Sequence, residues 1–229
     1  MRNDYIHVTF VIDKSGSMYS SKDEVISGVQ KIINEQKDIK KGKCTVSMYT
    51  FNDKVSEDYV GVDVNDLPIF KYYPESMTAL NDGCGIAIDN TGKWLASMNE
   101  EDRPSKVIIA VFTDGMENAS KEYTIEQVRG KIEHQEKVYN WTFIYLGTDI
   151  TTSKASDELG FKYSTYGSRD KLGNNYNIVS SSVKAYRSMA NSNATMDSVD
   201  EVFCSTLNEE TTKNTAEYEK YLGRKISKD

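Results

Sequence analysis

Five oxygen-bearing side chains stand where a chain could hold a metal ion. Asp13, Ser15 and Ser17 alternate directly after the apolar run YIHVTFVI, and Asp114 follows a second apolar run, SKVIIAVFT. Thr78 lies in MTALNDG, shortly before a predicted helix. Carboxylate and hydroxyl oxygens are hard donors, which suit Mg²⁺ and its near-octahedral oxygen shell. No His or Cys stands in DKSGS, MTALNDG or TDG, where the five residues lie, which argues against a zinc-type site.

Both acids come at the ends of predicted strands. Residues 5–13 and 105–114 are rich in β-branched and aromatic types, which indicates strands buried on both faces. Ligands of open α/β sheets bind at the carboxyl ends of parallel strands, where the chain order reverses. If these two strands are central neighbours, both carboxylates lie at one sheet edge, beside Ser15 and Ser17 on an exposed loop.

The rest of the chain alternates between helix and strand patterns. Apolar periodicity predicts helices at 22–36, 82–98, 124–137, 153–160 and 171–190, and strands at 44–52, 54–62, 140–148 and 161–165. We expect Asn81 or Asp82 to cap the helix at 82–98. A very short connection joins 44–52 to 54–62 and predicts an antiparallel hairpin. The pattern predicts a Rossmann-like, doubly wound α/β fold, with a mostly parallel sheet, one antiparallel edge strand and helices on both faces.

Composition and length indicate one large domain with an extension. We place the domain at 1–190 and a polar, partly helical extension at 191–229, with a helix around 209–222. The residues available to dock the extension are Val202, Phe203, Leu207, Tyr218, Tyr221 and Leu222.

The formal net charge of −7 argues against nucleic acid or anionic lipid as a partner. Three widely spaced cysteines form neither a disulfide framework nor a zinc motif. The sequence has no signal-peptide pattern and no apolar run of membrane-spanning length. We therefore predict a cytoplasmic protein.

The ordered oxygen donors resemble the metal-ion-dependent adhesion site (MIDAS) of the von Willebrand factor A (VWA) domain family. The match consists of Asp13-x-Ser15-x-Ser17, Thr78 in TALND and Asp114 in FTDGMEN. Residues 143–161, FIYLGTDITTSKASDELGF, are similar to the late strand, acidic loop and short helix of small stand-alone bacterial and phage members. The likeness extends over roughly residues 4–190.

The resemblance implies a role for each residue. Ser15 and Ser17 would bind Mg²⁺ or Mn²⁺ directly, and Thr78 would join them in one of two states of its loop. Asp13 and Asp114 would act directly or through bound water. The protein would then be a binding module and not an enzyme, with a metal that captures an Asp or Glu carboxylate of a protein partner.

Simpler interpretations compete for the same residues. DKSGS could be a turn with local side-chain to backbone bonds, and Asp114-Gly115 could be a hairpin turn. Asp149 follows a further predicted strand, and it either borders the site or, as we favour, serves as a loop or helix-cap acid.

The alternative function is magnesium-dependent phosphoryl transfer with Asp13 as nucleophile. Haloacid-dehalogenase-like phosphatases place a second Asp two residues after the nucleophile, where this chain has Ser15. The sequence also lacks a phosphate-binding Gly-rich loop with Lys and a G-x-S-x-G elbow. It therefore favours the binding module.

Overall fold

A six-stranded sheet forms the centre of the computed structural model, which describes residues 1–147, 153–166, 172–190 and 196–226. The strands are β1 (Arg2–Asp13), β2 (Lys43–Phe51), β3 (Val55–Asp63), β4 (Pro104–Thr113), β5 (Thr142–Gly147) and β6 (Tyr163–Tyr166), in the order β3-β2-β1-β4-β5-β6. β2 and β3 pair antiparallel, and the other neighbours pair in parallel. The predicted sheet with one antiparallel edge strand is confirmed.

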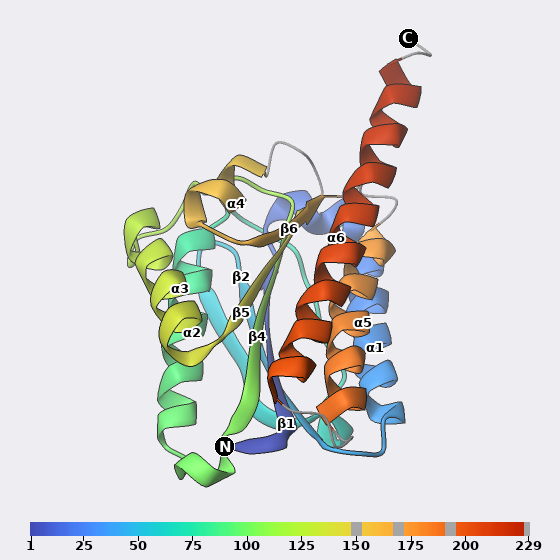
Figure 1. Ribbon diagram of the computed structural model, residues 1–229. Helices are drawn as coiled ribbons and strands as arrows, with labels where there is room; N and C mark the ends of the chain where they lie inside the picture. Colours follow the sequence, from blue (N-terminus) through green and yellow to red (C-terminus); the bar gives the residue numbers. More distant parts are fainter. Residues whose placement is uncertain (148–152, 167–171, 191–195, 227–229) are drawn as a thin grey trace.

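Helices cover both faces of the sheet, as predicted for a doubly wound fold. They are α1 (Lys22–Asp38), α2 (Leu80–Ala96), α3 (Ile125–Tyr139), α4 (Ser153–Leu159), α5 (Leu172–Ala190) and α6 (Met196–Ile226). α1, α5 and α6 lie on one face, and α2, α3 and α4 lie on the other (Figure 1). Short 3-10 turns, among them Gly16–Ser21 after β1, were not predicted.

β1 is buried on both sides, which explains its nearly continuous apolar sequence. Its residues Ile6, Val8, Phe10 and Ile12 belong to the core under α1 and α5, whereas Val11 belongs to the core under α2 and α3. On the α2 face, the buried His7 ring hydrogen-bonds Thr45 Oγ1 at 2.8 Å and lies 4.5 Å from the Trp94 ring. The central strand therefore carries one polar cluster within an apolar layer.

α1 and α5 pack closely because α1 has a glycine at their contact. A Cβ atom on Gly28 would lie within 2.2 Å of the Tyr176 ring, so only glycine fits there. The same ring stacks on Phe112 of β4 at 4.7 Å between centroids. Tyr176 thereby joins α1, α5 and the central sheet.

The predicted helix around 209–222 is part of the longer α6. Phe203 and Leu207 are fully buried in the core under α5, and the Phe203 ring lies 6.0 Å from that of Tyr186. The C-terminal half of α6 projects beyond the sheet (Figure 1). The side chains of Tyr218, Tyr221 and Leu222 are outside the described ones, and the domain boundary at residue 190 remains a prediction.

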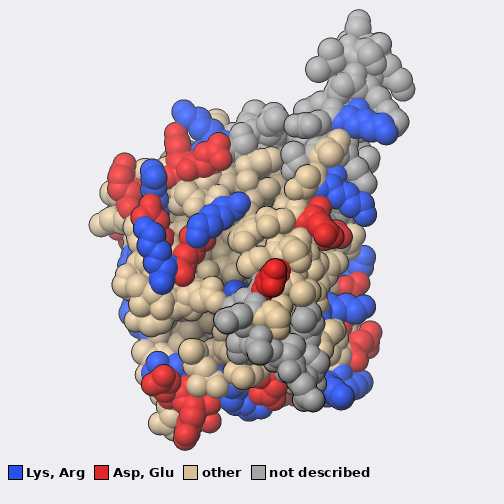
Figure 2. Space-filling model, viewed as in Figure 1, with Lys and Arg blue, Asp and Glu red and all other residues tan. Residues whose placement is uncertain are grey.

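None of the helices in the described ranges is long and apolar enough to cross a membrane. On the face shown in Figure 2, acidic and basic side chains are intermingled along the outer helices. Neither the acidic nor the basic side chains form a continuous patch on this face, so the face has no extended electrostatic potential of one sign.

Candidate metal centre

The order of the chain through the sheet reverses between β1 and β4. These strands are parallel neighbours at the centre of the sheet, with Ile12 opposite Phe112. Asp13 is the last residue of β1, and Asp114 follows the last residue of β4. The expectation that the two acids share one sheet edge is confirmed, and this edge is where open α/β sheets bind ligands.

Asp13 is fully buried, and its carboxylate is held from two sides. Oδ2 accepts a hydrogen bond from Thr113 Oγ1 at 2.6 Å, and Oδ1 accepts one from the Ser15 backbone N–H at 2.7 Å. Burial raises the pKa of Asp13 to about 6, against the effect of these hydrogen bonds, because the charged form loses its hydration. A nearby cation would compensate this cost.

The two serines connect Asp13 to Asp114. Ser15 Oγ lies 3.1 Å from Ser17 Oγ, and Ser17 Oγ donates to Asp114 Oδ1 at 2.5 Å. Ser17 is exposed, but only 1% of Ser15 is accessible. The expectation that both serines lie on an exposed loop is therefore wrong for Ser15, because the 3-10 turn Gly16–Ser21 and the segment 75–76 fold against it.

The segment before α2 fixes this loop through the backbone. The Gly16 N–H donates to the Ser76 carbonyl at 3.0 Å, and the Glu75 N–H donates to the Lys14 carbonyl at 2.8 Å. Tyr72, which is buried, donates its hydroxyl hydrogen bond to the Asp13 carbonyl. The sequence places Tyr72 near a candidate site loop, where an aromatic residue suits an interface, but its bond to Asp13 was not predicted, since nothing in the sequence relates position 72 to position 13.

Thr78 completes the group, and Gly115 leaves the space for it. Thr78 is buried, with 3% accessible. A Cβ atom at position 115 would lie 3.0 Å from Thr78 Oγ1 and 3.5 Å from Asp13 Oδ2. Both oxygens thus face the α-carbon of Gly115, and the structure brings all five predicted residues together.

The loop after β4 is attached to the start of α2. The Asn118 side chain accepts from the Thr78 N–H at 2.9 Å, while the Asn118 and Ala119 N–H groups donate to the Thr78 carbonyl at 3.0 and 3.1 Å. Glu117 accepts from the Asn81 N–H at 2.9 Å and from two N–H groups of its own loop. Glu117 therefore satisfies a donor in the first turn of α2 from outside the helix.

The predicted caps of α2 are wrong. Its N-cap is Ala79, without a side-chain cap. Asp82 instead accepts from the N–H groups of Lys121, Glu122 and Tyr123 at 2.8 to 2.9 Å. Glu117 thus binds the start of α2, and Asp82 of α2 binds the segment before α3. In both cases the bonded residues are more than 35 positions apart, so short-range capping patterns do not reveal these bonds.

The donor set fits a hard divalent cation. No three His, Cys, Asp or Glu side chains come together as a metal site in the described part of the chain. The group is instead two carboxylates and three hydroxyls, all oxygen, at one sheet edge. The local turn interpretation accounts for the Ser15 to Asp13 bond alone.

One of the two remaining alternatives can be judged from the chain path. The hairpin interpretation of Asp114-Gly115 is wrong, because β4 pairs with β1 and β5 in parallel and a loop to α3 follows it. Asp149 lies outside the described residues.

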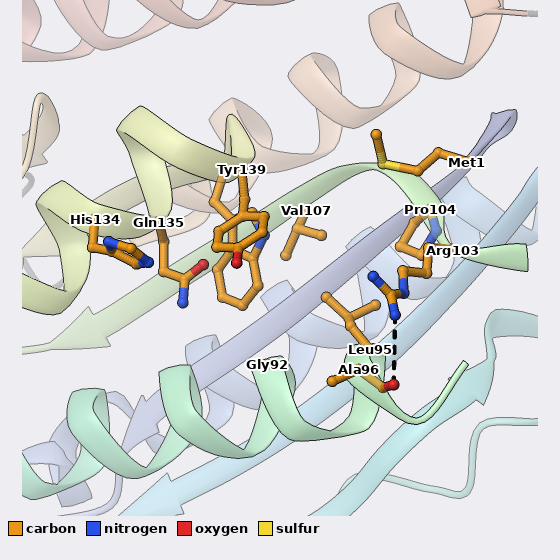
Figure 3. A pocket seen from close by; sticks show the side chains of 11 residues that line it. Met1, Gly92, Leu95, Ala96, Arg103, Pro104, Val107, His134, Gln135 and Tyr139 are labelled. Atoms are coloured by element: carbon orange, nitrogen blue, oxygen red, sulfur yellow. Dashed lines mark hydrogen bonds between the residues drawn. The ribbon is translucent and has the colours of Figure 1, made fainter. Parts of the chain in front are cut away.

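A separate hollow lies at the opposite end of β4. Figure 3 shows this cavity of about 300 Å³, between α2, α3 and the start of β4. Its walls include Leu95, Arg103, Val107, Gln135, Tyr139 and Trp141. Because Asp114 follows the other end of β4, this cavity is distinct from the candidate metal centre.

Comparison with known proteins relates the fold to solved structures. The sequence matches no protein-family model and no curated protein. Proximal thread matrix protein 1 of the mussel byssus is similar, with a TM-score of 0.56, 18% identity and coverage of 77% of this chain and 45% of that chain. A further structure of the mussel protein has a zinc-occupied MIDAS motif.

Two bacterial pilus proteins are also similar. The vWF domain of the type V pili tip protein Mfa5 from Porphyromonas gingivalis has a TM-score of 0.58, 8% identity and coverage of 84% of this chain and 98% of that chain. The pilus adhesin SpaC from Lactobacillus rhamnosus GG has a TM-score of 0.58, 13% identity, and coverage of 78% and 30%. This chain thus spans less than half of the mussel protein and of the adhesin. At such identities the likeness is one of fold.

Proposed function

From the VWA fold of this chain, we propose that it is a metal-dependent protein-binding module. The observation that carries the proposal is the convergence of Asp13, Ser15, Ser17, Thr78 and Asp114 at the central sheet edge. The similarity to a pilus adhesin and to a protein with a metal-occupied MIDAS supports the same conclusion.

In this proposal the hydroxyls of Ser15, Ser17 and Thr78 and the carboxylates of Asp13 and Asp114 hold Mg²⁺ or Mn²⁺. The cation supplies a Lewis-acid position that can accept an Asp or Glu carboxylate from a protein partner. Neutral hydroxyls leave much of its charge uncompensated, which favours an anionic partner group. Zinc is the competing metal because a similar fold holds it, and the all-oxygen donors favour Mg²⁺ or Mn²⁺.

The environment of Asp13 supports binding over phosphoryl transfer. A nucleophilic carboxylate must reach the phosphorus atom, but Asp13 has no accessible surface and both its oxygens accept hydrogen bonds. Its burial suits a residue that positions Ser15 and balances the charge of a cation. Magnesium-dependent hydrolysis of a generic phosphate ester by the purified chain would favour the enzyme instead.

Cytoplasmic location stays part of the proposal. The three cysteines are free, and Cys44 and Cys84 are buried, as in proteins of a reducing compartment.

The test is calorimetric titration of Mg²⁺, Mn²⁺ and Zn²⁺ into wild type and Ser17→Ala. Ser17 is exposed and its loss removes no buried apolar surface, so the fold should persist. We expect Mg²⁺ affinity to fall at least about tenfold, because one of roughly six ligands is lost. Ser27→Ala, in an exposed turn of α1, is the matched control and should bind as wild type. Equal Mg²⁺ binding by well-folded Ser17→Ala would contradict the proposed site.

A further inference from the structure

Large apolar side chains are exposed on the loops of the candidate metal centre. Among the described residues, the exposed large hydrophobic side chains are Met1, Tyr19, Ile69, Tyr73, Met77, Met116, Val138 and Tyr139. Four of them lie on the three loops that carry the metal-site residues, and we call these four the apolar rim: Tyr19, Tyr73, Met77 and Met116. Their accessible fractions are 72%, 68%, 54% and 67%.

The rim residues are close neighbours of the site along the chain. Tyr19 is two residues after Ser17, Met77 precedes Thr78, and Met116 is two residues after Asp114. Exposed apolar side chains scattered singly need no explanation, but a group gathered at one site marks an interaction surface.

Backbone bonds hold the three loops of the rim together. The first and second loops are joined by the bond from Gly16 to Ser76, and the second and third by those from Asn118 and Ala119 to Thr78. The Lys22 ammonium lies 5.0 Å from the centroid of the Tyr73 ring, which holds this ring beside the start of α1. The rim therefore consists of two tyrosines and two methionines on loops that backbone hydrogen bonds hold together. The methionine side chains are flexible and can adapt to the shape of a partner.

We propose that the apolar rim makes the module select an acidic residue flanked by large apolar side chains. This inference rests on the proposed function, since the metal is the anchor for the acid. The partner carboxylate would reach the metal centre, and the neighbouring apolar side chains would cover the rim. Tyr and Met are enriched at protein interfaces, because each buries a large apolar area and leaves few polar atoms that need a hydrogen-bond partner.

A protein segment fits this surface better than a lipid bilayer. The chain carries a net charge of −7, which opposes binding to anionic membranes. The metal centre also selects carboxylates, which protein side chains provide together with apolar neighbours.

The first experiment selects random peptides displayed on phage against the immobilised full chain in Mg²⁺, with elution by EDTA. We expect enriched peptides to carry Asp or Glu with Leu, Phe, Met, Tyr or Trp within two positions. Enrichment of acids flanked by Gly, Ser or charged residues would overturn the inference but leave the proposed function standing. If the peptides eluted by EDTA are not enriched in Asp or Glu, both the inference and the proposed function are overturned. Flotation with anionic vesicles in EDTA would overturn the choice of a protein partner.

The second experiment measures the affinity of the best selected peptide by fluorescence polarisation. Tyr73→Ser with Met116→Ser should weaken it at least about tenfold, as truncation of central interface side chains does, and leave Mg²⁺ affinity unchanged. Tyr139→Ser is the matched control, because Tyr139 is 59% accessible and lies at the opposite end of the molecule beside the cavity of Figure 3. Equal peptide affinity in the rim variant and this control would overturn the inference.

Discussion

Gly115 keeps open the space between Thr78 and Asp13. Its backbone does not require a positive φ, so the need for glycine is steric alone. A methyl group there would lie 3.0 Å from Thr78 Oγ1, closer than nine in ten such contacts, and 3.5 Å from Asp13 Oδ2. The residue therefore positions the oxygen donors without supplying one.

Gly115→Ala should consequently separate metal binding from folding. We expect Mg²⁺ affinity to fall several-fold, because Thr78 must move away from the added methyl group, while the circular dichroism spectrum stays that of wild type. Gly130→Ala is the matched control, since a Cβ atom there has no neighbour within 4 Å. It lies in α3 and should stabilise the fold by about 0.5–1 kcal/mol without altering the titration. Wild-type Mg²⁺ affinity in Gly115→Ala would show that this space is not part of the site.

The loop after β4 and the start of α2 form one unit through Glu117 and Asp82. Glu117→Ala removes the acceptor of the Asn81, Ala119 and Ser120 N–H groups. We expect a loss of about 2 kcal/mol in the free energy of unfolding, because these donors lose their partner. Mg²⁺ affinity should fall as well, since Asn118 no longer holds Thr78 on a fixed loop.

Urea unfolding in EDTA measures the first effect, and calorimetry measures the second. Glu133→Ala is a suitable control, because Glu133 pairs on the surface of α3 with Arg129 and Lys137 and should change stability by less than about 0.5 kcal/mol. A Glu117→Ala variant as stable as this control would refute the role given to Glu117.

Sequence periodicity was sufficient to predict the main helices and strands, but it did not predict the contacts between loops. The buried runs ending in Asp13 and Asp114 predicted the central strands, because a strand covered on both faces is apolar at nearly every position. The start of α2 could not be predicted in the same way. The Asn81 N–H donates to Glu117 and the Asp82 N–H donates to Ser120 Oγ, while the Asp82 carboxylate binds residues 121–123, so neither acid follows the local capping rule.

The C-terminal segment concerns the whole molecule. Its polar composition predicted an extension that docks through a few apolar residues, and two of those residues, Phe203 and Leu207, are buried in the main core. Phe203 also lies under the ammonium of Lys106, at 5.0 Å from the ring centroid. Phe203 and Leu207 thus attach α6 to the same core that α1 and α5 cover.

Stability of the whole molecule should depend on pH through His7. The ring is fully buried beside Trp94 and hydrogen-bonded to Thr45, and burial lowers the pKa of His7 to about 3 from an ordinary value of 6.5. The unfolded chain therefore binds a proton on His7 below about pH 6.5, whereas the folded protein does not until about pH 3. His7 therefore lowers the free energy of unfolding as the pH falls below 6.5, by up to about 1.4 kcal/mol per pH unit.

The measurement is the free energy of urea unfolding in EDTA between pH 7 and pH 4, for wild type and His7→Gln. Asp13 acts in the opposite sense, since burial raises its pKa to about 6 and its protonation favours the folded state as the pH falls. Asp13 is present in both proteins, so their difference isolates His7. We expect His7→Gln to gain stability relative to wild type with each unit of acidification. His134→Gln, at an exposed position of α3, should follow the wild-type curve. Parallel curves for wild type and His7→Gln would mean that the ring takes up its proton equally in the folded and unfolded chains, against its burial.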